Sequence, residues 1–351
     1  MIIDDRNKLF IDLENIVNRK YFEEENYEKI KKNLEFLGLN FFKKAYIFLD
    51  EIQFLKNIPS VIKYFIDHYN TKFFLSGSSS FYLKNFFNES LAGRKYVFEI
   101  FPLSFKEFLS FKNTDFNISD KNLEVSRAIY DTLSPLYDEY MLYGGFPQVV
   151  LKDSIEEKER AIEDIFNSYF QLEVVQLGDF KKNNIVRDLM FLLMKSVGSK
   201  IDINKISKTL GVSRQSVNEY ISFLDGTYFI KIIRPYSTNR VTEIKKAPKV
   251  YLCDSGVLNH FSKIDSGLLF ENNIFQNLRL RGEVNYYQKK NGMGIDFISN
   301  KSVSYEVKWT GDKSYMNKLK RLSDELNIGE YKIVSKNYVN TSLKTVYPFE
   351  L

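Results

Sequence analysis

Apolar residues in the first hundred positions fall into short runs that are separated by segments of helical periodicity. The run at 45–49 contains no polar residue and ends at the adjacent carboxylates of Asp50 and Glu51. Such a run predicts a strand that is buried on both faces, as in a parallel sheet covered by helices. Other apolar runs predict further strands at 8–13, 71–75 and 96–100.

Helical patterns at 23–37 and 58–69 lie between these strands. Strands that alternate with helices predict an α/β layer. Ligands of such sheets bind beyond the carboxyl ends of the strands, which is where Asp50 and Glu51 would lie. Small polar residues that begin with Ser76 follow the third strand and could direct a hydroxyl at a phosphate or an attacking water. An ordinary strand end and a helix N-cap explain the same residues equally well.

From about residue 128 the pattern changes to longer helical segments. Two substantial helices are predicted at 153–178 and 183–197. Residues 200–224 then show a helix, a glycine-containing turn and a second helix, which is the helix-turn-helix pattern. Residues 227–234 would add a β wing, so the middle of the chain is predicted to be helical with a winged helix.

On this interpretation Arg214, Gln215 and Asn218 lie on the exposed face of the second helix, with side chains that can contact phosphates and bases. The net charge of +5 permits nucleic-acid binding without requiring it. Folds of this kind also serve as spacers between proteins. Double-stranded DNA and a protein are therefore both open as partners of this region.

Two strands in the last hundred residues are predicted to form a hairpin, at 294–298 and 303–308, about a turn at Asn300. Alternation along the second strand places Glu306 and Lys308 on one face. A pair of charged side chains on one strand face forms either a functional site or a solvent-exposed salt bridge. Salt bridges on strand faces are common.

Asp296 would lie opposite Tyr305 or Glu306 across this hairpin, and a preceding helix carries Glu271. A strand Asp, a Glu-x-Lys on the neighbouring strand and a helical Glu are the parts of a Mg²⁺-dependent nuclease. In such a site Asp296 and Glu306 would hold the metal, and Lys308 would orient or activate the attacking water.

Composition narrows the class of protein. The 351 residues are 44% hydrophobic and 27% charged, as in ordinary globular proteins, and no apolar run is long enough to span a bilayer. The first residues have no signal-peptide pattern, and the single cysteine, Cys253, excludes an intramolecular disulfide framework. We therefore expect a cytoplasmic protein. With two histidines, a multi-histidine metal site is not expected.

Nine short stretches together resemble a known family, namely prokaryotic AAA-type P-loop ATPases with an uncharacterised nuclease-like C-terminal domain. In chain order they read YIFLDEIQ (46–53), LSGSS (75–79), LAGR (91–94), PLSF (102–105), YGGFP (143–147), KVYLCDSG (249–256), FEN (270–272), DF (296–297) and EVK (306–308). The resemblance covers nearly the whole chain. It implies an AAA-type ATPase core at 1–112, a helical and winged-helix middle at 113–240, and an α/β restriction-endonuclease-like domain at 241–351.

The resemblance also implies roles for individual residues and implies ATP and Mg²⁺ as cofactors. Asp50 and Glu51 would be the Walker B pair, which binds Mg²⁺ and polarises the attacking water. Ser76 would be the sensor on the neighbouring strand, and Arg94 would be a transition-state arginine.

Two features depart from the family pattern. The family has a Glu two residues before the strand Asp, where this chain has Gly294. A phosphate-binding loop needs Gly-Lys followed by Ser or Thr, and none of the 16 glycines is followed by Lys. Family members place this loop before the strand that matches 8–13, so we expect that the chain begins after the loop and binds nucleotide poorly.

Three functions are open on this sequence. The first is an ATPase of this family that begins after its phosphate-binding loop. The second is a DNA-binding or toxin-defence-like module in which the nucleotide site is vestigial. The third is a Mg²⁺-dependent nuclease that acts through Glu271, Asp296, Glu306 and Lys308.

Overall fold

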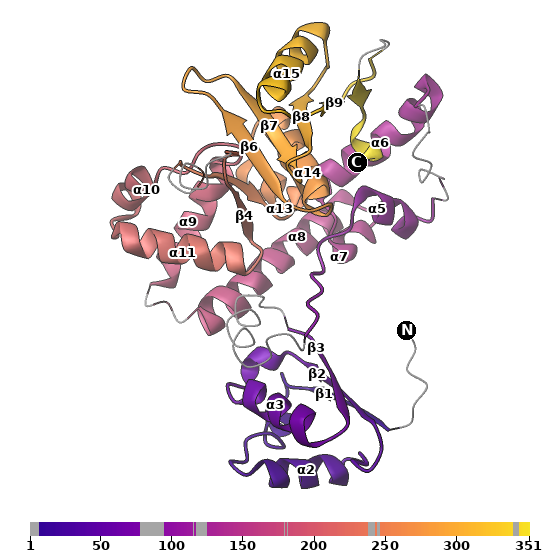
Figure 1. Cartoon of the computed structure of the whole chain (residues 1–351), viewed down its shortest axis with the longest axis vertical. Helices are drawn as coiled ribbons and strands as arrows, with labels where there is room; N and C mark the ends of the chain where they lie inside the picture. The colour runs from indigo at the N-terminus through magenta and orange to yellow at the C-terminus, as the bar shows by residue number, and fades with distance from the viewer. Residues whose placement is uncertain are drawn as a thin grey trace. The chain divides into compact units, whose positions relative to one another are not determined.

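The structure, a computed structural model, describes residues 7–77, 95–114, 116, 125–178, 180, 182–237, 243, 246–339 and 344–351. The chain divides into two compact units, Met1–Glu99 and Ile100–Leu351 (Figure 1). Among the described residues, the first unit contains a three-stranded sheet and the second contains a five-stranded and a two-stranded sheet. The expected domains at 113–240 and 241–351 both lie in the second unit, and the boundary between them stays a prediction.

A three-stranded parallel sheet forms the centre of the first unit. Its strands are β1 (Lys8–Asp12), β2 (Ala45–Asp50) and β3 (Thr71–Leu75), in the order β1-β2-β3. The helical segments are α1 (Ile16–Arg19), α2 (Tyr27–Phe36), the 3-10 turn η1 (Ile52–Phe54) and α3 (Ile58–His68). Apolar side chains of α2 and α3 pack on one face of the sheet, over Ile47 and Leu49. These elements confirm the first three predicted strands and both predicted helices.

The other face of this sheet carries three aromatic rings in register. Phe10 lies opposite Phe48, and Phe48 lies opposite Phe74. The rings of Phe48 and Phe74 stack at 4.6 Å between centroids, and Phe10 is 66% exposed. The prediction that the central strand is buried on both faces is therefore wrong. Alternate residues of β2 are buried and half-buried, because α2 and α3 cover only one face of the sheet.

The strand predicted at 96–100 is not formed. These residues are described and pair with no strand, and the side chains of Tyr96, Phe98 and Ile100 are between 86% and 95% exposed. Apolar sequence favours an extended backbone, but a strand forms only where a neighbour pairs with its N–H and C=O groups. Among the described strands β3 is an edge of the sheet, and this segment does not pair with it.

Helices make up the first half of the second unit. They are α5 (Phe105–Phe111), α6 (Arg127–Tyr143), α7 (Pro147–Val150), α8 (Ile155–Tyr169), the π-helix η2 (Phe170–Leu177), α9 (Asn183–Lys195), α10 (Ile203–Leu210) and α11 (Arg214–Gly226). Ser104 and Ser154 begin α5 and α8 with capping boxes. The predictions at 153–178 and 183–197 are confirmed by α8 with η2 and by α9. Among the described helices, none combines the length and the apolar character that crossing a membrane requires.

A tight turn joins α10 to α11. Gly211 has a φ of +65°, which is the left-handed conformation that ends a helix without strain at glycine. Ser213 then caps α11, because its hydroxyl accepts the N–H of Ser216 at 3.1 Å. The predicted helix, turn and helix are confirmed. The next strand, β4 (Ile230–Ile233), lies in the range predicted for the wing and pairs antiparallel with β5 (Lys249–Leu252).

A five-stranded mixed sheet, orange and yellow in Figure 1, has the order β10-β9-β8-β7-β6. Its strands are β6 (Val284–Gln288), β7 (Gly294–Ser299), β8 (Val303–Lys308), β9 (Glu330–Ser335) and β10 (Thr345–Val346). The remaining helical segments are α13 (Ser255–Ser262), α14 (Ser266–Arg279), α15 (Lys313–Glu325) and the 3-10 turn η3 (Pro348–Glu350). The hairpin predicted about Asn300 is confirmed as β7 and β8, with Asn300 at a φ of +49° in the turn.

Helices cover both faces of this sheet. Asp296 and Phe297 are successive residues of β7, so their side chains point to opposite faces. Phe297 faces α14, where its ring centroid lies 6.2 Å from that of Phe275. Glu306, on the same face as Asp296, accepts a hydrogen bond from Lys318 of α15. The acidic residues therefore lie on the face that α15 covers.

Two glycine-containing segments, 109 residues apart, form a tight junction between α6 and α13. The N–H of Gly145 donates to the carboxylate of Asp254 at 2.9 Å. A Cβ at Gly144 would lie 2.2 Å from a carboxylate oxygen of Asp254, and one at Gly256 would lie 2.1 Å from the carbonyl oxygen of Tyr143. The stretches YGGFP and KVYLCDSG thus meet in space, and their glycines are required because neighbouring atoms fill the Cβ positions.

Candidate functional site

Polar side chains meet at the carboxyl end of the three-stranded sheet. Asp50 ends β2, and Ser76 follows β3 at the neighbouring position in the register. The hydroxyl of Ser76 donates to Asp50 Oδ1 at 2.5 Å, and the N–H of Glu51 donates to the same oxygen at 3.1 Å. Within the described residues Asp50 Oδ2 accepts no hydrogen bond, so this oxygen is left for a ligand.

Asp12 extends this group to a third strand. It lies opposite Asp50 in the parallel register of β1 and β2, and its Oδ1 accepts the N–H of Glu14 at 2.8 Å. Asp12 was not predicted as a site residue. The available signal was an acid at the end of each of two parallel strands, because the carboxyl ends of parallel strands share one edge of a sheet.

The backbone of Glu51 is left-handed, with a φ of +53°. Non-glycine residues rarely adopt this conformation, which costs about 1–3 kcal/mol and recurs at functional sites. Gln53 donates a short hydrogen bond to the Glu51 carboxylate. Arg94, the expected transition-state arginine, lies outside the described residues. The structure therefore brings Asp50, Glu51 and Ser76 together and leaves the role of Arg94 as a prediction.

The donor set at this end of the sheet fits a hydrated Mg²⁺ ion, which prefers carboxylate oxygens and keeps several waters. Asp50 supplies a carboxylate oxygen, and Ser76 orients that carboxylate. The phosphates of a nucleotide need loop amides and the Lys of a Gly-Lys pair, which these 351 residues do not contain. The residues present therefore fit the metal and water side of a nucleotide site but not its phosphate side.

The second predicted site forms under α15, on the five-stranded sheet. Phe297 pairs with Tyr305 across the β7–β8 hairpin, which places Asp296 opposite Glu306. Of the two partners expected for Asp296, the structure therefore selects Glu306. The two carboxylates are cross-strand neighbours, so without cations between them they would repel each other.

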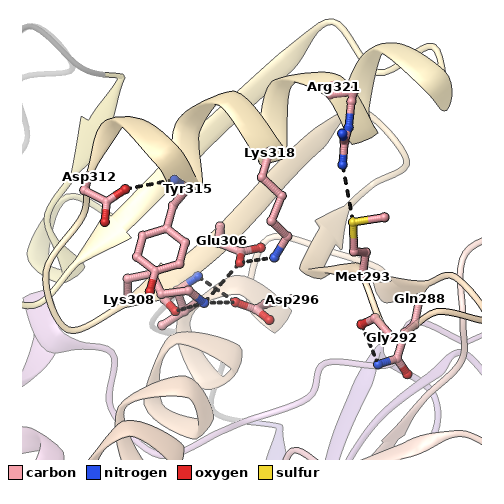
Figure 2. A network of polar contacts seen from close by, with 11 residues as sticks. Gln288, Gly292, Met293, Asp296, Glu306, Lys308, Asp312, Tyr315, Lys318 and Arg321 are labelled. Atoms are coloured by element: carbon pink, nitrogen blue, oxygen red, sulfur yellow. Dashed lines mark hydrogen bonds and ion pairs between the residues drawn. The ribbon is translucent and has the colours of Figure 1, made fainter.

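Two lysines neutralise these carboxylates (Figure 2). Lys308 Nζ lies 3.3 Å from Asp296 Oδ2 and 3.1 Å from Glu306 Oε1. Lys318 of α15 donates to Glu306 Oε1 at 2.6 Å. The side chain of Glu306 is only 1% exposed, so its charge is shielded from water and is balanced by the two ammonium groups.

Glu271 of α14 contributes a third carboxylate. The hydroxyl of Tyr251 donates to Glu271 Oε1 at 2.6 Å, and Lys249 Nζ lies 3.5 Å from the same oxygen. Both partners come from β5. They were not predicted as site residues, because contact between β5 and α14 depends on the folded chain and leaves no local pattern.

Burial and neighbouring charges shift the pKa values of these groups. Burial raises the pKa of Glu271 and of Glu306, and the negative charge of Asp296 raises each of them further. Burial alone would lower the pKa of Lys308, but Asp296 and Glu306 raise it overall. Perturbed pKa values of this kind mark functional sites, and buried ion-pair networks produce them too.

Lys318 was also not predicted. Its signal was the helical spacing of Met316, Leu319 and Leu322, which turns this side of α15 toward the sheet. Across the described ranges, no group of three or more His, Cys, Asp and Glu side chains is arranged to hold a metal ion. Figure 2 shows the ammonium groups of Lys308 and Lys318 beside the carboxylates of Asp296 and Glu306.

Gly294 is the position where the resembled family carries a Glu. A Cβ at Gly294 would lie 2.3 Å from the carbonyl oxygen of Tyr287 on β6. The strand would have to shift before any side chain could fit there. The set of carboxylates in this chain is therefore Glu271, Asp296 and Glu306, without a fourth acid on β7 beside Asp296.

The three residues predicted to contact nucleic acid all have exposed side chains on α11. Arg214 donates to Asn204 Oδ1 at 3.4 Å, and Gln215 donates to Glu219 Oε1 at 3.0 Å. Asn218 donates to the backbone of its own helix. Exposure leaves these side chains accessible to a partner, and the identity of that partner stays a prediction.

Two family models match separate parts of the chain. Residues 1–109 match a model described as an AAA domain, and residues 134–267 match one described as a domain of unknown function, DUF8612. The first match supports the resemblance to AAA-type P-loop proteins and agrees with the parallel sheet of the first unit. The restriction-endonuclease-like assignment of the last domain stays a prediction.

Curated relatives occur in archaea and bacteria. An uncharacterized protein of Methanocaldococcus jannaschii is 30% identical over 314 residues, which cover 83% of this chain and 68% of the relative. An uncharacterized protein of Haemophilus influenzae is 29% identical over 268 residues, which cover 74% of this chain and 64% of the relative. One of Mycobacterium tuberculosis is 22% identical over 229 residues, which cover 65% and 46%. The matched regions thus span about two thirds of the first two relatives and about half of the third.

Proposed function

Since this chain belongs to the same family as the uncharacterized protein of Methanocaldococcus jannaschii, we propose that it is an ATPase-type protein with its nucleotide site in the first unit. The observation that carries the proposal is the hydrogen bond from Ser76 to Asp50 at the carboxyl end of a parallel sheet. These residues lie within the region that matches an AAA domain. Ligands of such sheets bind at this end.

Each residue has a distinct role in this proposal. Asp50 would hold Mg²⁺ through Oδ2, and Ser76 would keep the Asp50 carboxylate in that orientation. Glu51 would accept the proton of the attacking water, and Arg94 would stabilise the charge that develops in the transition state. Mg²⁺-ATP, when bound, supplies the electrophilic phosphorus.

The 351-residue chain should bind ATP weakly, because no Gly-Lys pair is available to cradle the phosphates. We expect a Kd above about 1 mM in isothermal titration calorimetry with ATP and Mg²⁺. Low-micromolar binding by this chain would contradict the expectation.

A chimera tests the roles of the acids directly. A Gly-Lys-Thr loop with its own strand and helix, joined ahead of β1, should restore ATP binding. In that chimera Glu51→Gln should keep ATP bound and lower turnover at least about a hundredfold, because the proton acceptor is removed. Asp50→Asn should instead weaken the Mg²⁺-dependent part of binding. Equal turnover in the Glu51→Gln chimera and its parent would show that Glu51 is not the base.

We also propose that α11 binds duplex DNA. The single cysteine of the chain favours the cytoplasm as the place where the protein acts. The exposed Arg214, Gln215 and Asn218 support DNA contact, as does the turn before their helix. Affinity should fall steeply as salt rises, because Lys and Arg contacts release counterions.

Substitution of both Arg214→Ala and Gln215→Ala should weaken DNA binding about tenfold or more in fluorescence anisotropy. Arg160→Ala is the control, because it removes an exposed charge from α8 in the same unit. Equal affinity of the double variant and the parent would refute the assignment of α11.

A second candidate function is Mg²⁺-dependent cleavage of DNA by the C-terminal site. Asp296, Glu306 and Lys308 converge there, and the buried Glu306 Oε2 has no hydrogen-bond partner within the described residues. Asp296 and Glu306 would hold Mg²⁺, and Lys308 would orient the attacking water. Plasmid cleavage should be lost in Asp296→Asn and kept in the control Lys313→Ala. Cleavage that survives Asp296→Asn would exclude this site.

A further inference from the structure

The two carboxylate oxygens of Glu306 have different surroundings. Oε1 receives Lys318 at 2.6 Å and Lys308 at 3.1 Å. Oε2 is buried and has no hydrogen-bond partner among the residues that the structure describes. A buried acceptor without a partner is costly, and its side chain is 1% exposed, so the arrangement leaves one oxygen ready for a further ligand.

The charges of this cluster cancel. Glu271, Asp296 and Glu306 carry three negative charges, and three lysines within 3.5 Å of them carry three positive charges, namely Lys249, Lys308 and Lys318. A divalent cation binds in proportion to the negative charge that its ligands bring. The cluster as it stands therefore offers no net attraction to a cation, in spite of its three carboxylates.

Lys318 differs from Lys308 in how it is held. Lys308 belongs to β8 and contacts both Asp296 and Glu306, and it also donates to the carbonyl of Val307 at 2.9 Å. Lys318 reaches in from α15, is 32% exposed, and contacts only the Glu306 carboxylate among the described acids. Its flexible stem allows the ammonium group to move into solvent without a change in the sheet.

We infer that Lys318 occupies the cation position beside Glu306 and locks the C-terminal site, so that a divalent ion binds only when this ammonium group leaves. The inference rests on the second candidate function, because it takes Asp296 and Glu306 as the ligands of the metal. It adds a residue from α15 that sets whether the site is open or closed.

Removal of the lock should raise affinity for a divalent ion. The test uses the full chain and Mn²⁺ alone, with bound and free Mn²⁺ distinguished by electron paramagnetic resonance. Lys318→Met removes the charge and keeps an apolar stem, and it should bind Mn²⁺ at least about tenfold more tightly than the parent. Lys318→Arg keeps the charge and should bind as the parent does.

Lys320→Met is the matched control, because Lys320 is an exposed residue of the same helix and has no ion pair within the described residues. It should change Mn²⁺ affinity less than about twofold, since the exposed charge is screened by salt. A second measurement is the melting temperature of each variant, which Mn²⁺ should raise more in Lys318→Met than in the parent. Melting without Mn²⁺ reports whether each variant is folded.

The outcomes distinguish a failure of the Lys318 lock from a failure of the second candidate function. Tighter binding by Lys318→Met alone supports the lock. Equal Mn²⁺ affinity in the parent and Lys318→Met overturns the lock and leaves the metal site standing. No binding by either protein at millimolar Mn²⁺ overturns the lock and the metal site together. A gain in Lys318→Arg equal to that in Lys318→Met shows that charge is not the cause and also overturns the lock.

Discussion

Two lysines of the second unit form ion pairs with the carboxylate of Glu139. Lys112 Nζ lies 2.8 Å and Lys158 Nζ lies 2.6 Å from the same carboxylate oxygen. Burial alone would raise the pKa of Glu139, but the two ammonium groups outweigh it and hold the pKa below its ordinary value. A carboxyl group with a lowered pKa stabilises the fold above its unfolded pKa of about 4.3, and this contribution is lost as pH falls through the folded pKa.

Glu139→Gln should therefore lower the free energy of unfolding by about 1 kcal/mol at neutral pH. The difference from the parent should shrink as pH falls from the unfolded pKa of about 4.3 through the lower pKa of the folded carboxyl group, because the parent then loses its ion pairs. Urea unfolding at neutral pH and at acidic pH measures this. Asp131→Asn is the control, because its pair with Arg127 is exposed on both sides. An equal loss at both pH values would contradict ion pairing as the cause.

At the scale of elements, the contact between α6 and α13 depends on the absence of side chains. Gly256, in the first turn of α13, lies against the carbonyl of Tyr143, and Asp254 caps that helix while it accepts the N–H of Gly145. A carboxylate that accepts several backbone N–H groups satisfies helix ends that would otherwise be buried without partners. The junction thus fixes two helices at one point.

Gly256→Ala should lower the free energy of unfolding of the second unit by about 2–3 kcal/mol, because the new methyl group would lie 2.1 Å from the Tyr143 carbonyl oxygen. Gly329→Ala is the control, since a Cβ there meets nothing within 4 Å. Chemical unfolding followed by circular dichroism compares the two. Stability unchanged in Gly256→Ala would mean that α13 moves away from α6 at little cost.

Elements with a complete local pattern were predictable from the sequence. The hairpin of β7 and β8 has alternating strands about Asn300, and the turn before α11 has Gly211 at its helix end. The segment 96–100 has the residues of a strand, but a strand depends on a partner that no local pattern specifies. The same limit applied to Tyr251, which reaches the C-terminal site from β5 and is recognisable only once the chain is folded. Lys318 differs, because the helical spacing of α15 already turned its side of the helix toward the sheet.

At the scale of the molecule, the described sheets of the two units differ in how helices cover them. The sheet of the first unit has three described strands, helices on one face and the rings of Phe10, Phe48 and Phe74 on the other. A sheet that helices cover on one face buries less apolar surface than a sheet that helices cover on both faces.

The first unit should therefore open more readily than the second. Hydrogen exchange should be fast at 46–49 and at 72–75, and slow in β7 and β8, because the latter strands have helices on both faces of their sheet. Mass spectrometry of the exchanging chain measures both regions in one sample, so each serves as the reference for the other. Slow, uniform protection of both units would refute the argument from the open sheet.

The segment that begins the second unit has a mechanical consequence. The N–H of Leu103 donates to the carbonyl of Gly145 at 2.7 Å, and its carbonyl accepts the hydroxyl of Tyr140 at 2.8 Å. The guanidinium of Arg279 lies 3.9 Å from the ring centre of Phe101. Tension applied through the first unit would follow the chain, and it would reach the contacts with α14 and α6 before it reaches α5. In optical tweezers the first unit should extend at low force while these contacts keep the second unit closed.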